Sequence, residues 1–264
     1  MAHASMENRV YEIELDLEER KPGTLEHLVI AKFYRPGRWT KEQILEEHLY
    51  LKKLEEAEIP AVAPIVFTDG QTLHCLPDAD ILYAIFPKVG GRSPQEMNFE
   101  EMAQIGRLLA RMHNVGSSIK AEHRLRLTPD IYLTNSFQFL MHEKLIPDRL
   151  QQPFGDLVQR LQTKTQPLFA AADQILVHGD CHLGNLLQNG TSYFWVDFDD
   201  CIRGPAVQDL WLLLPGRDEY AQRSLHELLD AYEQMRPFPR SSLRLIEALR
   251  TFRMIHFAAW IAHR

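Results

Sequence analysis

The apolar residues of this sequence follow two different periods, and the change falls at Pro87-Lys88-Val89-Gly90-Gly91. Before this point, short apolar runs between turn residues predict one helix near 40–57 and strands near 11–15, 27–33, 65–67 and 81–86. After it, helical spacing dominates, with strands expected only near 175–178 and 193–196. We therefore predict an α+β fold of two lobes, a small β-rich N-terminal lobe at 1–89 and a larger, mainly helical C-terminal lobe at 90–264.

Size, charge and cysteine content limit the class of protein. A chain of 264 residues is long enough for two lobes, and its net charge of −7 argues against a nucleic-acid-binding surface. The three cysteines are odd in number and widely spaced, which fits a reducing compartment better than a disulfide framework. No run approaches the ~20 apolar residues of a membrane helix. We expect a cytoplasmic protein that binds neither nucleic acid nor membrane.

A polar cluster follows a short apolar strand in the C-terminal lobe, where Ile175-Leu176-Val177 leads into His178-Gly179-Asp180-Cys181-His182-Leu183-Gly184-Asn185. The two histidines have the spacing of the zinc-binding HExxH pattern, but that pattern needs a helix, and the two glycines oppose one. An isolated Asp-x-x-x-x-Asn would most simply form a turn whose side chains bond their own backbone. A catalytic loop is the third interpretation.

The spacing of three oxygen-bearing residues favours the catalytic loop. Asp180 and Asn185 are five apart, as in protein-kinase catalytic loops, and Asp197 follows at the end of an apolar strand, where kinases place the aspartate of Asp-Phe-Gly. Carboxylate and amide oxygens suit Mg²⁺, and one carboxylate remains to orient a hydroxyl. These residues predict phosphoryl transfer.

The N-terminal lobe supplies the expected counterparts. Leu28-Val29-Ile30-Ala31-Lys32 is close to the Val-Ala-Ile-Lys pattern of kinases, and Glu46 and Glu47 follow on the next helix. Taken alone, Lys32 could equally be an edge or surface lysine, and either glutamate could be a solvated charge. Together with the loop, they occur in the order found in kinases.

At this point the chain resembles a known family. Residues 178–185 match the HGDxHxGN signature of the aminoglycoside phosphotransferase and choline kinase-like superfamily, a bilobal relative of the protein kinases. Over nearly its whole length the chain is similar to the bacterial stress response kinase A family, at segments 5–11, 31–36, 44–48, 89–92 and 204–211. The resemblance implies a cytoplasmic, ATP- and Mg²⁺-dependent serine/threonine protein kinase of the stress response.

The resemblance also implies roles for matching residues. Asp180 would be the catalytic base, and Asn185 and Asp197 would bind Mg²⁺, with Asp197 counted as catalytic too. The nucleotide would be contacted by Ser5 in the phosphate loop and by Lys32, whose partner we expect to be Glu47 rather than Glu46. Asp209 would brace the catalytic loop. Adenine would lie against the segment from Phe86 to Val89, with the backbone N–H of Lys88 or Val89 as donor.

The chain departs from the family pattern in several places. Asp199 replaces the glycine of Asp-Phe-Gly, and the extreme N- and C-terminal segments of the family are expected to be missing. We expect Asp199, Asp200 and Arg203 either to line the acceptor cleft or to form a solvated loop.

The acceptor is the least constrained part of the prediction. Protein serine or threonine hydroxyls are expected, the enzyme itself being one candidate, and a monomer is expected. A small-molecule kinase acting on an aminoglycoside, choline or a similar hydroxyl compound would share every catalytic residue. The alternative outside enzymes is a pseudokinase-like binding module.

Overall fold

The computed structural model describes residues 2–3, 8–16, 24–214 and 216–263. Its strands are β1 (Ala2–His3), β2 (Arg9–Glu14), β3 (Leu28–Phe33), β4 (His74–Leu76), β5 (Ile81–Pro87), β6 (Ile175–Val177), β7 (Leu186–Asn189), β8 (Ser192–Trp195) and β9 (Ile202–Gly204). Its α-helices are α1 (Lys41–Glu56), α2 (Phe99–Ser118), α3 (Asn135–His142), α4 (Asp148–Ala170), α5 (Gln208–Trp211), α6 (Glu219–Glu233) and α7 (Ile246–Ala262). A π-helical turn, η1 (Asp130–Thr134), and 3-10 turns η2 (Leu183–Asn185), η3 (Phe198–Asp200) and η4 (Arg240–Leu245) complete the regular structure.

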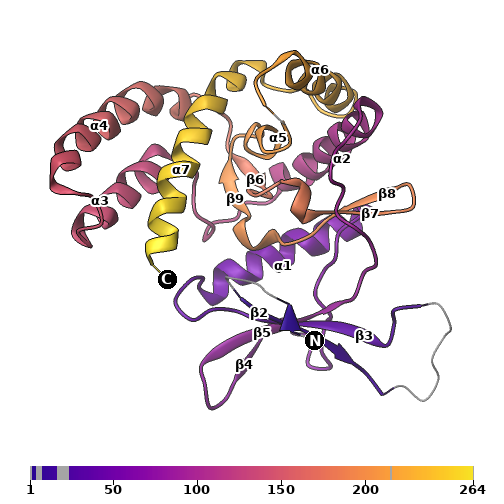
Figure 1. Ribbon diagram of the computed structural model, residues 1–264. Coiled ribbons are helices and arrows are strands. Elements are labelled where there is room, and N and C mark those ends of the chain that lie inside the picture. The colour runs from indigo at the N-terminus through magenta and orange to yellow at the C-terminus, as the bar shows by residue number, and fades with distance from the viewer. Residues whose placement is uncertain (1, 4–7, 17–23, 215, 264) are drawn as a thin grey trace.

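The first part of the chain forms one antiparallel sheet in the order β1-β2-β3-β5-β4 (Figure 1). β2 and β3 pair from Arg9↔Phe33 to Glu14↔Leu28, so the predicted hairpin is confirmed. β3 lies between β2 and β5, and Lys32 on it is buried. Lys32 is therefore neither an edge nor a surface lysine, and its charge needs partners inside the protein.

One predicted strand is wrong. Residues 65–67 form no strand, because only Ile65 bonds to the sheet, through its N–H and the Ile85 carbonyl at 2.7 Å. The Phe67 N–H turns instead to the carbonyl of Gln71 at 2.8 Å. Pro64, just before this run, has no N–H to extend the ladder. The outer strand beside β5 is β4, which the sequence pattern did not predict.

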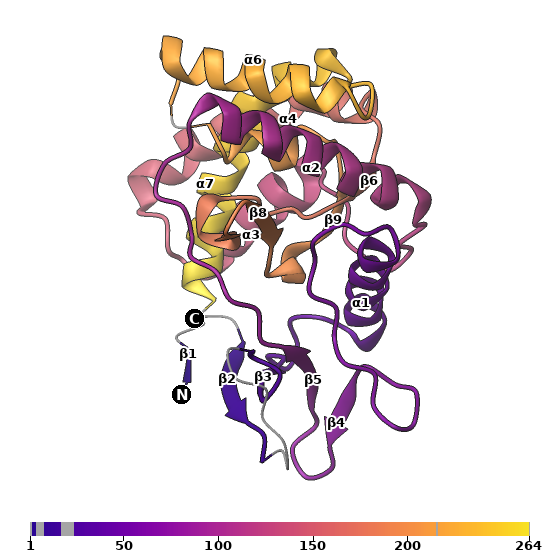
Figure 2. The same ribbon diagram turned by 90° about the vertical axis from the view of Figure 1, so that its right-hand side faces the viewer.

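Helix α1 lies between the sheet and the helical part of the chain (Figure 1 and Figure 2). It begins at the predicted capping box, in which the Thr40 side chain accepts from the Gln43 N–H and the Gln43 side chain accepts from the Thr40 N–H. Its buried face carries Ile44, Leu51 and Leu54, and also Glu47, which is 1% exposed. A carboxylate on α1 is thus held in the interior between the two parts.

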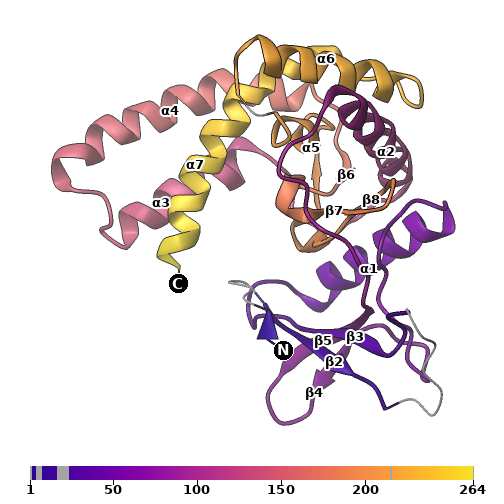
Figure 3. The same ribbon diagram turned by 45° about the vertical axis from the view of Figure 1, so that its right-hand side comes forward.

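The remainder of the chain is mainly helical, which confirms the predicted fold class. α2 and α6 pack closely at Gly106, where a Cβ would collide with the carbonyl oxygen of Leu228. α7 crosses the helical part with its C-terminal end toward the sheet (Figure 3). The core beneath includes the fully buried Trp195, Tyr232 and Phe252. Among the described helices, none combines the length and apolar content that crossing a bilayer requires.

Candidate active site

The polar loop after β6 turns sharply at Gly179. Its φ of 88° lies in the left-handed region, and a Cβ there would collide with the carbonyl oxygen of Asp200. Beyond the turn, Asn185 Nδ2 donates to the Asp180 carbonyl at 3.1 Å and lies 3.4 Å from Asp180 Oδ2. The motif therefore forms one hydrogen-bonded loop that holds Asp180 against Asn185.

The two histidines of the loop face different partners. His178 is buried, with Nε2 3.0 Å from the Val196 carbonyl and Nδ1 accepting from the Asp180 N–H at 3.3 Å. His182 Nδ1 accepts from the Gly184 N–H at 3.0 Å, and its Nε2 lies 3.3 Å from Asp180 Oδ2. The two imidazoles do not point toward one another, so each forms hydrogen bonds within the loop and the pair is not placed to bind one metal ion.

Asp209, on α5, supports this loop from below. Its two carboxylate oxygens accept from the N–H groups of His178 at 2.9 Å and Gly179 at 2.8 Å, and His113 Nε2 lies 3.0 Å away. Burial would raise the pKa of the Asp209 carboxyl, but the hydrogen bond and charge of His113 lower it below its ordinary value. Asp209 is therefore an ionised carboxylate, fully buried and fully partnered.

Asp209→Ala should lower the free energy of unfolding by about 3–5 kcal/mol, because it leaves two backbone N–H groups and His113 buried without their acceptor. Urea unfolding followed by circular dichroism measures this. Asp218→Ala is the control, since it removes only the cap of α6, where Asp218 Oδ1 accepts from the Ala221 N–H, and should lose about 1 kcal/mol. Equal losses in the two variants would contradict the bracing role.

The β7–β8 pair sets Asn185 opposite the residue that precedes Asp197. The Val196 N–H donates to the Asn185 carbonyl at 3.0 Å, which places Asp197 next along the chain. Asp197 has φ 63° and ψ 64°, and its side chain is 57% exposed. In the described part of the chain no group of three or more His, Cys, Asp or Glu side chains is arranged to hold a metal. Two oxygen donors that leave most of the octahedron to phosphates and water fit Mg²⁺.

Lys32 lies at the centre of a buried ionic network. Its Nζ is 3.3 Å from Glu47 Oε1 and 4.0 Å from Asp197 Oδ1, and it also pairs with Asp199. Burial alone would lower the pKa of Lys32, but Asp199 and Glu47 raise it well above its ordinary value. The ammonium therefore stays charged in a buried place beside Asp197.

Arg124 completes this network, and no sequence motif indicated it. Its Nη2 donates to Glu47 Oε2 at 3.0 Å and its Nη1 to the Asp199 carbonyl at 2.6 Å. Glu46 instead accepts from the backbone N–H of Arg124 at 2.7 Å and of His123 at 2.9 Å. Lys32 is thus paired with Glu47, whereas Glu46 binds the backbone of the segment after α2.

Glu47→Gln should reduce kcat/KM for ATP markedly, because the neutral amide no longer fixes Lys32, while Glu46→Gln should have almost no effect, because its amide oxygen can still accept from the backbone. Lys32→Met should damage catalysis more than either. Steady-state kinetics at varied ATP, with thermal unfolding as a check of folding, measures all three. A larger defect in Glu46→Gln than in Glu47→Gln would mean that the partner of Lys32 is assigned one residue too far along the helix.

In the segment predicted to contact adenine, some backbone groups already form hydrogen bonds within the sheet. The Lys88 N–H donates to the Leu28 carbonyl at 3.2 Å, so one of the two predicted adenine donors is already used. Phe86 pairs with Ile30 in the same ladder, and its ring lies 5.7 Å from Lys32 Nζ. Because backbone groups alternate between the two sides of a strand, the Pro87 carbonyl points away from β3, and Val89 lies just beyond the end of β5. Of the two predicted donors to adenine, the Val89 N–H remains.

Asp180 has two close neighbours, His182 from its own loop and Arg253, which the sequence did not indicate. Arg253, on α7, donates from Nη1 to Asp180 Oδ1 at 2.7 Å, while His182 lies near Oδ2. Burial would raise the pKa of Asp180, but His182 and Arg253 lower it to about 2. Seventy-three residues separate Asp180 from Arg253, so only the tertiary structure brings them together.

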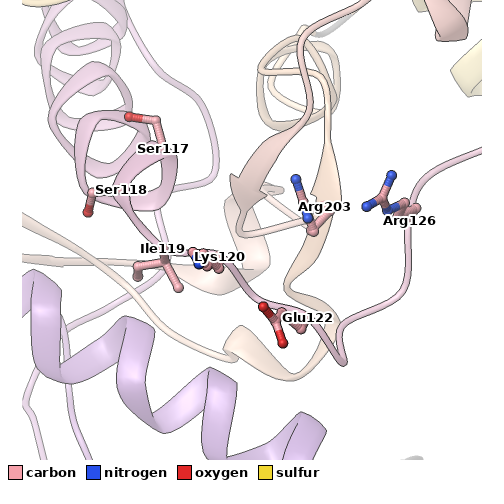
Figure 4. Close-up of a pocket in the computed structure, with 7 residues that line it drawn as sticks. All are labelled: Ser117, Ser118, Ile119, Lys120, Glu122, Arg126 and Arg203. Carbon is pink, nitrogen blue, oxygen red and sulfur yellow. The ribbon is translucent and has the colours of Figure 1, made fainter.

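The residues expected to line the acceptor cleft take three different places. Asp199 is buried, bound to Lys32 and to Asn8 Nδ2, so it is neither a cleft nor a solvated residue. Asp200 accepts from Arg38 Nη2 at 2.7 Å. Arg203 instead lines a separate pocket of about 420 Å³ with Ser117, Ser118, Ile119, Lys120, Glu122 and Arg126 (Figure 4). Ser5 lies outside the described residues.

The chain belongs to the phosphotransferase enzyme family, whose profile matches residues 4–242. Within it, the chain is similar to stress response kinase A of Escherichia coli (strain K12), with 38% identity over 261 residues that make up 98% of this chain and 76% of that protein. It is likewise 37% identical, over 98% of its length and 76% of the other, to the serine/threonine protein kinase RdoA of Salmonella typhimurium (strain LT2). The resemblance to the stress response kinase A family is confirmed.

Solved structures support the fold. An amicoumacin kinase, solved with AMP-PNP, Ca²⁺ and Ami, superposes with a TM-score of 0.80 at 22% identity, over 98% of this chain and 79% of the other. A spectinomycin phosphotransferase, solved with ADP and spectinomycin, gives 0.68 at 17% identity, over 97% of this chain and 78% of the other. At these identities the likeness establishes a kinase-like fold.

Proposed function

We propose that the protein is an ATP- and Mg²⁺-dependent kinase that phosphorylates serine or threonine hydroxyls of proteins. The observation that carries the proposal is the set of contacts that holds Asp180 against Asn185, pairs Asn185 with the residue before Asp197, and joins Asp197 through Lys32 to Glu47. Lys32 and Glu47 lie far from the other three residues in the sequence, and each of these residues has the chemistry that phosphoryl transfer needs. The name of the Salmonella relative supports a protein acceptor.

The residues divide the reaction between them. Lys32 would contact the α- and β-phosphates, and Asn185 and Asp197 would hold Mg²⁺, which neutralises phosphate charge when bound. Asp180 would orient the acceptor hydroxyl and take its proton. The hydroxyl oxygen then forms a bond to the γ-phosphorus, the bond from that phosphorus to the bridging oxygen breaks, and ADP leaves with the electron pair.

Adenine would be held at the end of β5. The donor would be the Val89 N–H, just beyond the end of β5, and the acceptor would be the Pro87 carbonyl, on the side of β5 away from β3. Val89→Pro removes the donor and should weaken ATP binding by about tenfold, roughly the loss of one buried hydrogen bond. Calorimetric titration with Mg·ATP measures the change, and Val89→Ala, which keeps the N–H, is the control. Equal affinities for the two variants would exclude this hinge contact.

The charges around Asp180 favour a protein acceptor over an aminoglycoside. Asp180, Asp199 and Asp200 each already face a cation, from Arg253, Lys32 and Arg38 respectively. A polycationic acceptor needs carboxylates that are open to it. A small-molecule kinase for such compounds would therefore have to free several paired carboxylates, whereas a serine or threonine hydroxyl needs one oxygen of Asp180 alone.

Labelled ATP offered with different acceptors tests the proposal. The panel contains an acidic protein, a basic protein, the enzyme itself, and a set of aminoglycosides and amino alcohols. We expect label on protein. Faster transfer to an aminoglycoside or choline-like compound would replace the protein-kinase proposal with a small-molecule kinase. Mg·ATP binding with no transfer to any acceptor or to water would instead support the pseudokinase alternative.

A further inference from the structure

Arg253 covers one of the two carboxylate oxygens of Asp180, the proposed base. Of the two carboxylate oxygens of Asp180, Oδ2 lies against His182 and Asn185 within the loop. Oδ1 is bound by Arg253 Nη1, which comes from α7 and not from the loop. The Arg253 side chain is 43% exposed, against 20% for Asp180. Oδ1 of Asp180 is therefore covered by a side chain that is itself more exposed than Asp180.

The Arg253 guanidinium has donors to spare. A guanidinium carries five N–H donors in a rigid fork, and this fork matches the two oxygens of a carboxylate. Within the described residues, Asp180 is the one hydrogen-bonding partner of the Arg253 side chain. Its remaining N–H groups can bind a second anion while the charge stays close to the base.

The surroundings make this place suited to an anionic group. One turn along α7, the His256 ring lies tilted against Tyr132 of η1, with ring centroids 4.6 Å apart, and its Nδ1 lies 3.1 Å from Ser136 Oγ. Asp200 is already paired with Arg38. His256 and Tyr132 bring no negative charge to this side of α7, and Asp200 already has a cation, so Asp180 is the carboxylate that an arriving acidic group replaces on Arg253.

We propose that Arg253 selects acceptors that carry a carboxylate beside the hydroxyl, so that the preferred substrates are serines or threonines flanked by aspartate or glutamate. The inference rests on the proposed protein-kinase function. In the free enzyme Arg253 covers Asp180 Oδ1. When the acceptor binds, its hydroxyl takes Oδ1 and its neighbouring carboxylate takes the guanidinium. Arg253 is on this view a specificity-determining residue that also guards the base.

The test uses three synthetic peptides that share one serine and differ only in flanking residues, which are glutamate, glutamine or lysine. We measure kcat/KM for each with the wild-type enzyme and with Arg253→Gln, Arg253→Lys and Arg253→Glu. The wild type should prefer the glutamate peptide over the lysine peptide by about tenfold or more, as expected for one close charge pair. Arg253→Gln should abolish the preference, Arg253→Lys should keep part of it, and Arg253→Glu should reverse it.

Arg244→Gln is the matched control, because Arg244 is an exposed arginine on η4 whose side chain donates to the Ser241 carbonyl. It should leave the preference unchanged. Thermal midpoints and Mg·ATP affinities show that each variant is folded and binds nucleotide. A wild-type enzyme that phosphorylates all three peptides alike, or a preference that survives in Arg253→Gln, overturns the inference while the proposed function stands. Transfer to aminoglycosides and to no peptide overturns both.

Discussion

Asp180→Asn should lower turnover by ~10²–10⁴-fold while ATP binding is retained. The substitution keeps the shape of the side chain and its hydrogen bond to Arg253, but an amide cannot take a proton from the acceptor hydroxyl. Asp180 is the one carboxylate that the loop presents next to Asn185, so no neighbour in the loop replaces it as a base. The loss should appear in kcat and not in the affinity for Mg·ATP.

A single-turnover assay with excess enzyme measures this without interference from product release. Asp173→Asn is the control, since Asp173 is an exposed aspartate just before β6 and should leave the rate unchanged. Turnover near that of the wild type in Asp180→Asn would remove Asp180 from the role of base. A parallel loss of Mg·ATP affinity would instead give Asp180 a role in binding the nucleotide.

Asp197→Ala should abolish Mg²⁺-dependent nucleotide binding and activity. The exposed Asp197 carboxylate is the charged oxygen donor beside Asn185, and Mg²⁺ held without it would depend on one neutral amide. Asp197 also has a left-handed backbone, with φ at 63°, which alanine disfavours and asparagine tolerates. Asp197→Asn therefore separates the loss of the ligand charge from strain in the backbone.

Calorimetric titration of ATP at several Mg²⁺ concentrations measures the effect. Both variants should lose the Mg²⁺ dependence of ATP affinity, and thermal unfolding should show a loss of stability in Asp197→Ala alone. Unchanged Mg·ATP affinity in both variants would exclude Asp197 as a ligand. Lost affinity that Asp197→Asn restores in full would mean that the backbone, and not the carboxylate, is what the site requires.

The sequence predicted the parts of this site that lie within short motifs. Asp180, Asn185 and Asp197 surround strands whose order and spacing are fixed locally, and Lys32 sits within a strand of strong apolar pattern. Arg253 and Arg124 could not be predicted in this way, because each meets the site through a contact across 70 or more residues, between elements whose packing no local pattern encodes. The prediction of a strand at 65–67 failed for a related reason, because an apolar run becomes a strand only where a neighbouring strand accepts its hydrogen bonds.

The pairing of Lys32 with Glu47 has a consequence for how the enzyme is controlled. In protein kinases, this ion pair forms when the helix bearing the glutamate swings inward, and that movement is where activation acts. Here Arg124 donates both to the Glu47 carboxylate and to the Asp199 carbonyl, and Glu46 on the same helix accepts from the backbone of the segment after α2. A helix anchored at both glutamates has little freedom to swing out as an off switch. Control by an outward movement of α1 would first have to break the contacts of both glutamates.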